Sequence, residues 1–298
     1  MTPRFEAFCR RKEAAARAAL IPGYVTREGP ARPGLVGVGT AWSRELFDGE
    51  FYRSAAPARD SLPITSLVFV QSRNGNTIAP LPSMLGGGET DLHLVYEGLS
   101  RVDADAVLSG STSARGRDLV FSVWHPDLVE LRLSRGHHRH PAQVIITERG
   151  ELRFDDGLMF LEPGVQVFVI TRTAMVAPIR RRVDGRPWIE VIDAGEPLSP
   201  RVGMQALRGR GIKVVSCIGG PRTATALLAE GLIDDIYLTT SAIDAGEPGT
   251  PYYQGPPLPL ERIVLKEGTG VEAGVRFEHF VVAGRGPGFA VEGDPRTR

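Results

Sequence analysis

The stretch KVVSCIGGPRTATALLAEGLIDDIYLTTS, residues 213–241, constrains the fold more than any other part of the chain. It reads as a short apolar strand, a Gly219-Gly220 turn, a helix that begins at Pro221 and a second apolar strand. Proline is favoured at the first position of a helix, where its missing N–H would have no partner in any case. Two strands joined through a helix predict a parallel pair, because parallel neighbours need a crossover of this kind.

The same alternation of strands and helices runs through most of the chain. Apolar strand runs occur at residues 64–71, 105–110, 142–147, 165–171, 213–218 and 234–241. Helical patterns occur at residues 90–101, 125–133, 204–210 and 221–230. The last two strand runs, 263–267 and 275–282, are typical of an antiparallel pair. We therefore predict an α/β fold with a mostly parallel central sheet, helices on both faces and a C-terminal antiparallel hairpin.

The first 63 residues differ from the rest of the chain. Residues 4–20 have the pattern of an amphipathic helix, and residues 22–63 are rich in Pro and Gly with one weak strand, LVGVG. Residues 22–63 contain too few apolar residues to fold alone. We predict that residues 1–63 form a helix and an extension that pack on a main domain, residues 64–283, and that residues 284–298 form a flexible tail.

Composition excludes several classes of partner and site. The 35 basic residues balance 35 acidic ones, which argues against a dedicated nucleic-acid binder. No apolar run approaches the ~18 residues of a membrane span, and the first twenty residues lack the apolar core of a signal peptide. We predict a cytoplasmic protein with no nucleic-acid or membrane partner. Two cysteines, Cys9 and Cys217, exclude a disulfide framework and a cysteine-rich zinc site.

Three loops that follow strands carry residues suited to phosphate groups. Ligands of open α/β sheets bind outside the carboxyl ends of the strands. The candidates are Gly110, Ser111, Thr112 and Arg115 in the first loop, Gly219, Gly220, Pro221, Arg222 and Thr223 in the second, and Thr147 and Arg149 in the third. Glycine allows close backbone approach, and a helix N-terminus favours a pyrophosphate. An arginine at a strand end suits a ribose 2′-phosphate, which favours NADP over NAD. Each loop, taken alone, is also compatible with an ordinary surface turn.

Four stretches and one glycine, taken together, resemble the reductase domain of bacterial bifunctional riboflavin-biosynthesis deaminase-reductases, which has a dihydrofolate-reductase-like fold. They are SRNGNTIA, LSRVDADAVLSGSTSARG, VIITERGEL, CIGGPRTATALLAEGLIDDIYL and Gly246 beyond the following strand. The fourth stretch is the most specific, because Gly-Gly-Pro, a leucine-rich helix and Gly-Leu-Ile-Asp-Asp-Ile follow one another as in the family. The resemblance covers about residues 64–283.

The resemblance implies an NADPH-dependent reductase that acts on a ribosylamino-pyrimidine or a pteridine-like heterocycle, commonly as a homodimer. It implies that the loops at Gly110 and Thr112, at Gly219 and Gly220, and at Thr147 and Arg149 hold the cofactor. Nothing in the chain matches the H-x-E…P-C-x-x-C zinc signature of the deaminase half.

Two positions depart from the family on the substrate side. Asn74 replaces the aspartate of the family's Ser-x-Asp-Gly, and Ile218 replaces the glutamate before Gly-Gly, as in ordinary dihydrofolate reductases. Asparagine forms hydrogen bonds but does not transfer a proton as a carboxylate does. Two alternatives therefore stay open. One is a catalytically degenerate module that binds NADPH or another nucleotide, and the other, less favoured, is a dihydrofolate reductase.

The remaining candidates lie near the predicted helix at residues 90–101. We expect Asn74 to hydrogen-bond the substrate and Asp91 or Glu89 to relay a proton, although Thr90 or Asp91 could instead cap the helix. Residues 86–88, a Gly-Gly-Gly run, suit either a lid or phosphate cradle or a flexible hairpin tip. The histidines of RGHHRHP, His137, His138 and His140, lack helix spacing and a nearby cysteine, so we expect a solvated loop and no metal site.

Overall fold

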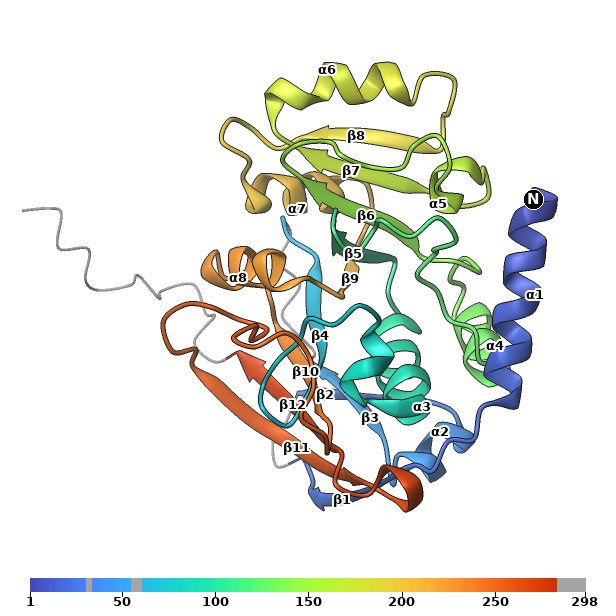
Figure 1. Cartoon of the computed structure of the whole chain (residues 1–298), viewed down its shortest axis with the longest axis vertical. Helices are drawn as coiled ribbons and strands as arrows, with labels where there is room; N and C mark the ends of the chain where they lie inside the picture. The colour runs from blue at the N-terminus through green and yellow to red at the C-terminus, as the bar shows by residue number, and fades with distance from the viewer. Residues whose placement is uncertain (31–33, 55–60, 283–298) are drawn as a thin grey trace, which may run out of the picture.

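The computed structural model describes residues 1–30, 34–54 and 61–282. These residues form one large twisted sheet and the elements that pack on it (Figure 1). The strands of this sheet follow the order β1-β11-β12-β10-β4-β9-β5-β6-β7-β8. Every neighbouring pair from β10 to β8 is parallel, and β12, β11 and β1 extend the sheet in antiparallel pairing. The predicted mostly parallel sheet and the C-terminal antiparallel pair are therefore confirmed.

The bounds of the elements are as follows. The main sheet contains β1 (Tyr24–Glu28), β4 (Ile64–Gln71), β5 (Ala106–Gly110), β6 (Ala142–Thr147), β7 (Val167–Thr171), β8 (Ile189–Asp193), β9 (Val214–Cys217), β10 (Asp235–Thr240), β11 (Leu260–Gly268) and β12 (Arg276–Val282). A separate hairpin pairs β2 (Leu35–Val38) with β3 (Phe51–Ser54). The helices are α1 (Pro3–Ala18), α2 (Ala41–Leu46), α3 (Gly88–Thr90), α4 (Pro126–Ser134), α5 (Leu158–Leu161), α6 (Thr173–Arg182), α7 (Pro200–Gly209) and α8 (Pro221–Ala229). The short 3-10 helices η1 (Pro82–Leu85) and η3 (Gly270–Glu272) complete the fold, together with the π-helix η2 (Asp91–Arg101), which continues α3.

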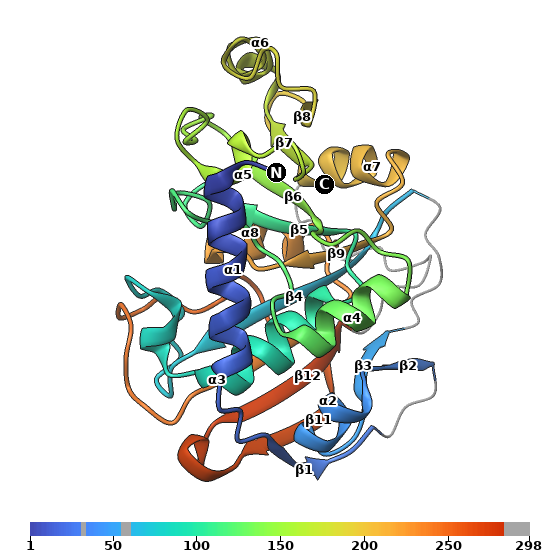
Figure 2. The same ribbon diagram turned by 90° about the vertical axis from the view of Figure 1, so that its right-hand side faces the viewer.

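Side chains of the strands alternate between two faces of the sheet, and each face has its own helices. On β7, Phe168 and Ile170 pack in the core cluster that includes α7 and α8, whereas Val167 and Val169 pack in the cluster that includes α1, α5 and α6. This alternation is the period-two pattern of a strand buried on both faces. Figure 1 shows α7 and α8 on one side of the sheet with α1 and α4 on the other, and Figure 2 shows α1 beside α4.

The N-terminal segment adds to both the sheet and the core. Helix α1 places Phe8 edge-on against Trp124, with ring centroids 5.4 Å apart, and β1 forms an edge strand beside β11. The buried Lys266 ammonium of β11 donates to the Thr26 hydroxyl at 2.8 Å and to the Phe47 carbonyl at 2.6 Å. The division into domains at residue 63 stays a prediction, and the predicted tail, residues 284–298, lies outside the described residues.

Two elements at the far edge of the sheet have no clear signal in the sequence. Helix α6 contains Pro178 and ends in three arginines, and proline in a helix interior is strongly disfavoured. Strand β8 is short and is the next element after this helix. Within the described residues, no helix is long and apolar enough to cross a bilayer.

The predicted cap of the helix over residues 90–101 is wrong. The helix begins earlier, at Gly88, so Thr90 already has helical backbone angles and its side chain makes no capping hydrogen bond. Its first turn is satisfied from a distant part of the chain, because the Thr90 N–H donates to the Glu272 carboxylate at 3.3 Å. A cap supplied from 182 residues away leaves no local sequence signal.

Candidate functional site

The three predicted loops lie side by side at the carboxyl edge of the sheet, because β9, β5 and β6 are parallel neighbours. The first two interlock. The Gly110 N–H donates to the Gly219 carbonyl at 3.0 Å, and a Cβ at Gly110 would lie 2.7 Å from the Thr223 hydroxyl. The Ser111 N–H donates to the Ile146 carbonyl of β6 at 3.2 Å. The structure thus joins residues that are more than 100 positions apart into one glycine-lined edge.

The Gly219-Gly220 turn requires glycine on steric grounds. Both residues have positive φ, +62° and +82°, and a Cβ at Gly219 would lie 2.6 Å from the Phe69 ring. Helix α8 begins immediately afterwards at Pro221, and no side chain caps it. The first N–H groups of such a helix, together with its positive dipole end, form an anion site. Arg222 and Thr223 lie in this first turn.

In the third loop the Thr147 hydroxyl, predicted to face a ligand, instead bonds within the turn. The Thr147 side chain is buried, and its hydroxyl accepts the Gly150 N–H at 3.1 Å, which shapes the turn. Arg149, at the tip of this turn, is exposed. Arg172, immediately after β7, donates to the Glu148 carbonyl at 3.0 Å and lies 3.3 Å from Glu196. Arg172 is not among the residues predicted from the sequence, although its place directly after a strand run was a usable signal.

Asp91 lies on the opposite side of β4 from these loops, on helix η2, which packs against β4 and β10. Its side chain is 5% exposed, and its Oδ1 has no hydrogen-bond partner within the described residues. Burial raises the pKa of Asp91 to about 7; the nearby charge of Glu272 adds to the rise, while the Thr239 hydroxyl and Arg101 oppose it. Asp91 therefore holds a proton at a pH where an ordinary aspartate is ionised.

Tyr24 of β1 brings the N-terminal segment close enough for the charge of Asp91 to act on it. This ring is buried against Phe47 and Phe277, and its hydroxyl has no hydrogen-bond partner within the described residues. Burial raises the pKa of Tyr24, and the charges of Asp91 and Glu272 raise it further. Tyr24 lies outside the stretches that resemble the family, so no motif pointed to it.

The Gly-Gly-Gly run covers the two carboxyl groups as a packed layer. A Cβ at Gly87 would lie 2.8 Å from Val70 and 2.9 Å from Asp91 Oδ2. A Cβ at Gly88 would lie 2.2 Å from Glu272 Oε1. The absence of side chains at these positions lets the backbone lie directly over Asp91 and Glu272.

Glu89, the alternative proton donor, lies on a different face of the helix. Its side chain is 52% exposed and lies 3.3 Å from His93 Nε2. The other ring nitrogen of His93 lies 3.4 Å from buried Glu97, which accepts the backbone N–H of Trp124 at 2.8 Å. Burial lowers the pKa of His93, but the two glutamates outweigh it and leave the pKa raised. Glu89 thus belongs to a Glu-His-Glu row that supports the start of α4.

Asn74 lies in the loop after β4, at the same carboxyl edge as the glycine loops. Its side chain is exposed, and its Oδ1 accepts a hydrogen bond from the Ser72 hydroxyl at 2.5 Å. Contacts between the described residues do not join Asn74 to Asp91. Of the three residues predicted for the substrate side, Asp91 alone combines burial, an unpartnered oxygen and a raised pKa.

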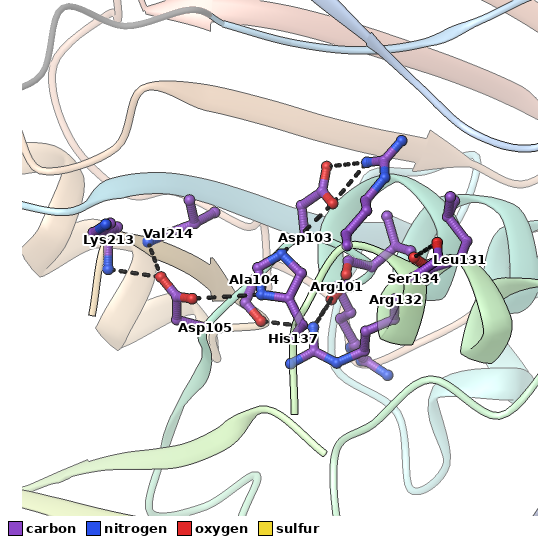
Figure 3. Close-up of polar contacts among 12 residues, drawn as sticks. Arg101, Asp103, Ala104, Asp105, Leu131, Arg132, Ser134, His137, Lys213 and Val214 are labelled. Carbon is purple, nitrogen blue, oxygen red and sulfur yellow. Dashed lines mark hydrogen bonds and ion pairs between the residues drawn. The ribbon is translucent and has the colours of Figure 1, made fainter. Parts of the chain in front are cut away.

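The histidines of RGHHRHP lie in three separate environments. His137 lies between Asp103 and Asp105, at 3.8 and 3.6 Å (Figure 3). Burial lowers the pKa of His140 to about 3, and its Nδ1 lies 2.8 Å from the Ser122 hydroxyl. His138 is exposed. These imidazoles do not converge on a common point.

The acidic residues around His137 have a structural role at the amino edge of the sheet. Figure 3 shows Asp105 accepting the backbone N–H groups of Lys213 and Val214, at 2.7 and 2.9 Å. Arg132 donates to the carbonyl groups that end helix η2, including those of Arg101 at 2.9 Å and Ala104 at 2.8 Å. These contacts hold the starts of β5 and β9 against the end of η2, on the edge opposite the glycine loops.

Comparison with known proteins agrees with this arrangement. Residues 88–273 match the family model of the RibD C-terminal domain. A pyrimidine reductase-like protein from Corynebacterium diphtheriae has 21% identity and a TM-score of 0.62, over 82% of this chain and 99% of that one. RibD from Acinetobacter baumannii has 16% identity and a TM-score of 0.54, over 74% of this chain and 58% of that one. A deaminase/5-amino-6-(5-phosphoribosylamino)uracil reductase from Thermotoga maritima has 16% identity and a TM-score of 0.51, over 74% and 57%. At these identities the structural likeness is one of fold. No curated protein matches the chain.

Proposed function

This chain belongs to the RibD C-terminal domain family and is an oxidoreductase of the riboflavin-biosynthesis reductase type; we propose that it transfers a hydride from NADPH to a ribosylamino-pyrimidine or pteridine-like heterocycle. The observation that carries the proposal is the interlocked edge at Gly110 and Gly219, with the buried acid Asp91 across β4 from it. A homodimer and a cytoplasmic location stay predictions.

The cofactor side has the groups that NADPH requires. The uncapped start of α8 and the bare backbone at Gly110, Gly219 and Gly220 suit the pyrophosphate. Arg149 and Arg172 extend from neighbouring strand ends and suit the 2′-phosphate, which needs a cationic partner. When bound, the nicotinamide supplies the hydride.

Reduction of a C=N bond or a ring-opened imine also consumes a proton. Asp91 is the residue that we propose as its source, because it is protonated near neutral pH and one of its oxygens is unpartnered. A general acid with a pKa close to the working pH is the most effective. Glu272 and Tyr24 lie near this carboxyl group, and the backbone of Gly87 and Gly88 packs against Asp91 and Glu272. Asn74 would contribute hydrogen bonds to the substrate.

The proposal is tested by thermal-shift titrations with NADPH and NADH, followed by NADPH oxidation assays with ribosylaminopyrimidine and pteridine substrates. Binding to the native state alone raises the melting temperature as ligand exceeds its Kd. We expect a shift with NADPH, a smaller one with NADH and turnover of one substrate class. A shift without turnover of either class would support the degenerate NADPH-binding module instead. Absence of a shift with both nucleotides would refute the cofactor site.

Replacement of Arg149 or Arg172 by Ala should weaken NADPH by about 10- to 100-fold and leave NADH nearly unchanged, because only NADPH carries the 2′-phosphate that a charged hydrogen bond would stabilise. Dissociation constants from fluorescence titration provide the measurement. Arg181→Ala, at an exposed position on α6, removes the same charge elsewhere and should leave both constants unchanged. Equal weakening of NADPH and NADH would reject the 2′-phosphate role.

Replacement of Glu272 by Gln should move the pH dependence of kcat to lower pH. The charge of Glu272 raises the pKa of Asp91, so its loss lets Asp91 ionise earlier, whereas the amide oxygen can still accept the Thr90 N–H. Each unit of downward shift lowers kcat about tenfold at a pH above both values. Glu130→Gln, at an exposed position on α4, is the matched control. An unchanged profile would show that Glu272 only caps the helix.

A further inference from the structure

Strand β1 places Tyr24 beside the turn that carries Glu272. The Thr269 hydroxyl donates to the Pro22 carbonyl at 2.6 Å, and the Thr269 carbonyl accepts the Glu272 N–H at 3.0 Å. Tyr24, two residues after Pro22, is the cross-strand partner of Gly268. A Cβ at Gly268 would lie 3.3 Å from the Glu272 Cβ. Tyr24 and Glu272 therefore flank the same position without a side chain.

Tyr24 also shares a face of the sheet with the acid. Val70 of β4, Thr239 of β10 and Phe277 of β12 are cross-strand neighbours, so their side chains point to one face. Asp91 lies at the Val70 end of this row. The Tyr24 ring packs at the other end, with its centroid 6.0 Å from that of Phe277. Thr239 lies between the two ends of the row.

Three polar groups along this row are buried without a partner. The hydroxyl groups of Tyr24 and Thr239 and the Oδ1 atom of Asp91 make no hydrogen bond within the described residues. A buried donor or acceptor without a partner is costly. Burial and the charges of Asp91 and Glu272 raise the pKa of Tyr24, so the phenol keeps its hydrogen. Tyr24 therefore presents an unused hydrogen-bond donor near the acid.

The proton transfer proposed for Asp91 leaves a second negative charge in the interior. The ionisable groups that act on this carboxyl group, or respond to its charge, are Glu272 of η3, Arg101 and Tyr96 of η2 and Tyr24 of β1. Glu272 opposes the new charge, and Arg101 favours it. A hydrogen bond to the ionised form of a carboxyl group stabilises that form. Tyr24 has the donor that such a bond requires.

We propose that Tyr24 is a positioning residue of the reduction, whose phenolic O–H donates a hydrogen bond to the carboxylate that Asp91 becomes when it gives its proton to the substrate. In this step the Asp91 O–H bond breaks, an N–H bond forms on the substrate, and Tyr24 keeps its own proton. The inference rests on the proposed function and deepens it. It extends the reaction site to strand β1, which lies outside the family match at residues 88–273.

Tyr24→Phe removes the hydroxyl and keeps the ring, so it tests this bond in the full chain. Without the donor the ionised form of Asp91 is less stable, and its pKa should rise by about one unit, the loss of one hydrogen bond to a charged group. The fall of kcat with pH should move upward by the same amount, and kcat below it should drop by up to about tenfold. Glu272→Gln moves the same fall downward, so the two variants should differ in sign.

Tyr237→Phe is the matched control for the loss of a buried phenol. Tyr237 is buried on β10, and its hydroxyl donates to the Tyr52 carbonyl at 3.2 Å. This variant should lose stability, because the Tyr52 carbonyl loses its donor, and it should keep the pH profile of the wild type. An unmoved or downward-moved profile in Tyr24→Phe would overturn the inference and leave Tyr24 a packing residue.

A stability measurement separates this inference from the proposed function. The difference in melting temperature between Asp91→Asn and the chain with Asp91 should grow with pH until Asp91 ionises and then level off. We expect it to level off near pH 7 in the wild-type background and about one unit higher in Tyr24→Phe. This result supports the hydrogen bond even if no heterocycle is reduced, which would contradict the proposed function alone. The same pH in both backgrounds would overturn the inference.

Discussion

Replacement of Asp91 by Asn should lower kcat by at least about 100-fold, the usual contribution of a general acid. The amide has nearly the same shape but holds no proton that it can transfer. The Kd of NADPH should remain unchanged, because the glycine loops lie across β4 from this residue. Single-turnover hydride transfer, followed by the loss of NADPH absorbance, separates this step from binding. Glu89→Gln, on another face of the same helix, is the control and should retain most of the activity.

The pH dependence of the wild type follows from the same carboxyl group. With a pKa of about 7 in the folded protein, Asp91 is protonated below that pH, and kcat should fall as the pH rises through 7. Stability should also fall as the pH rises, since the folded state binds more protons than the unfolded state between the ordinary aspartate pKa and 7. Each unit of pH increase in that interval lowers the contribution of Asp91 to the free energy of unfolding by about 1.4 kcal/mol.

Asp91→Asn should consequently be inactive and yet more stable than the wild type at pH 8. The difference in melting temperature should grow from pH 5 to pH 8, because only the wild type must bury a charge at high pH. A variant that is inactive and also less stable at pH 8 would instead point to a structural role for Asp91. Retention of wild-type kcat in a folded variant would remove Asp91 from the mechanism.

Replacement of Gly219 by Ala should weaken NADPH binding more than tenfold and lower the melting temperature by several degrees. Positive φ costs an L-residue about 1–2 kcal/mol, and the added methyl group would meet the Phe69 ring at 2.6 Å. The overpacking adds about 1–3 kcal/mol. Relief of the clash requires movement of the Gly219 carbonyl, which accepts the Gly110 N–H. The edge that we assign to the pyrophosphate is therefore disturbed along with the core.

The chain contains a matched control for this substitution. Gly211 also has positive φ, +86°, but a Cβ there would meet nothing within 4 Å. Gly211→Ala should show the backbone cost alone, a small loss of stability with unchanged Kd for NADPH. Chemical denaturation and nucleotide titration of both variants provide the comparison. Equal effects of the two substitutions on NADPH binding would show that the Gly219 turn is not part of the cofactor site.

Local patterns were sufficient for the parts of the fold that are built from neighbouring residues. The strand, glycine turn and helix around Gly219 appear as expected, with Pro221 at the first position of α8. The prediction fails where local preference and tertiary packing disagree. Helix α6 forms despite Pro178, because Val176 and Ile179 are buried against the sheet. The helix over residues 90–101 extends back to Gly88, because distant Glu272 satisfies its first turn.

The sequence by itself predicted that the three loops lie at one edge of the sheet, since parallel strands linked by helices end on the same side. The strand order that makes β9, β5 and β6 neighbours came from the tertiary structure. The sequence also carried the family resemblance, which rests on ordered motifs. Only the tertiary structure decided which acid is protonated. Asp91 and Glu89 are both acidic residues at the start of the same predicted helix. Burial beside Glu272 raises the pKa of Asp91, whereas the half-exposed Glu89 pairs with His93. Desolvation and the field of a charge 181 positions away are properties of packing, which no local pattern records.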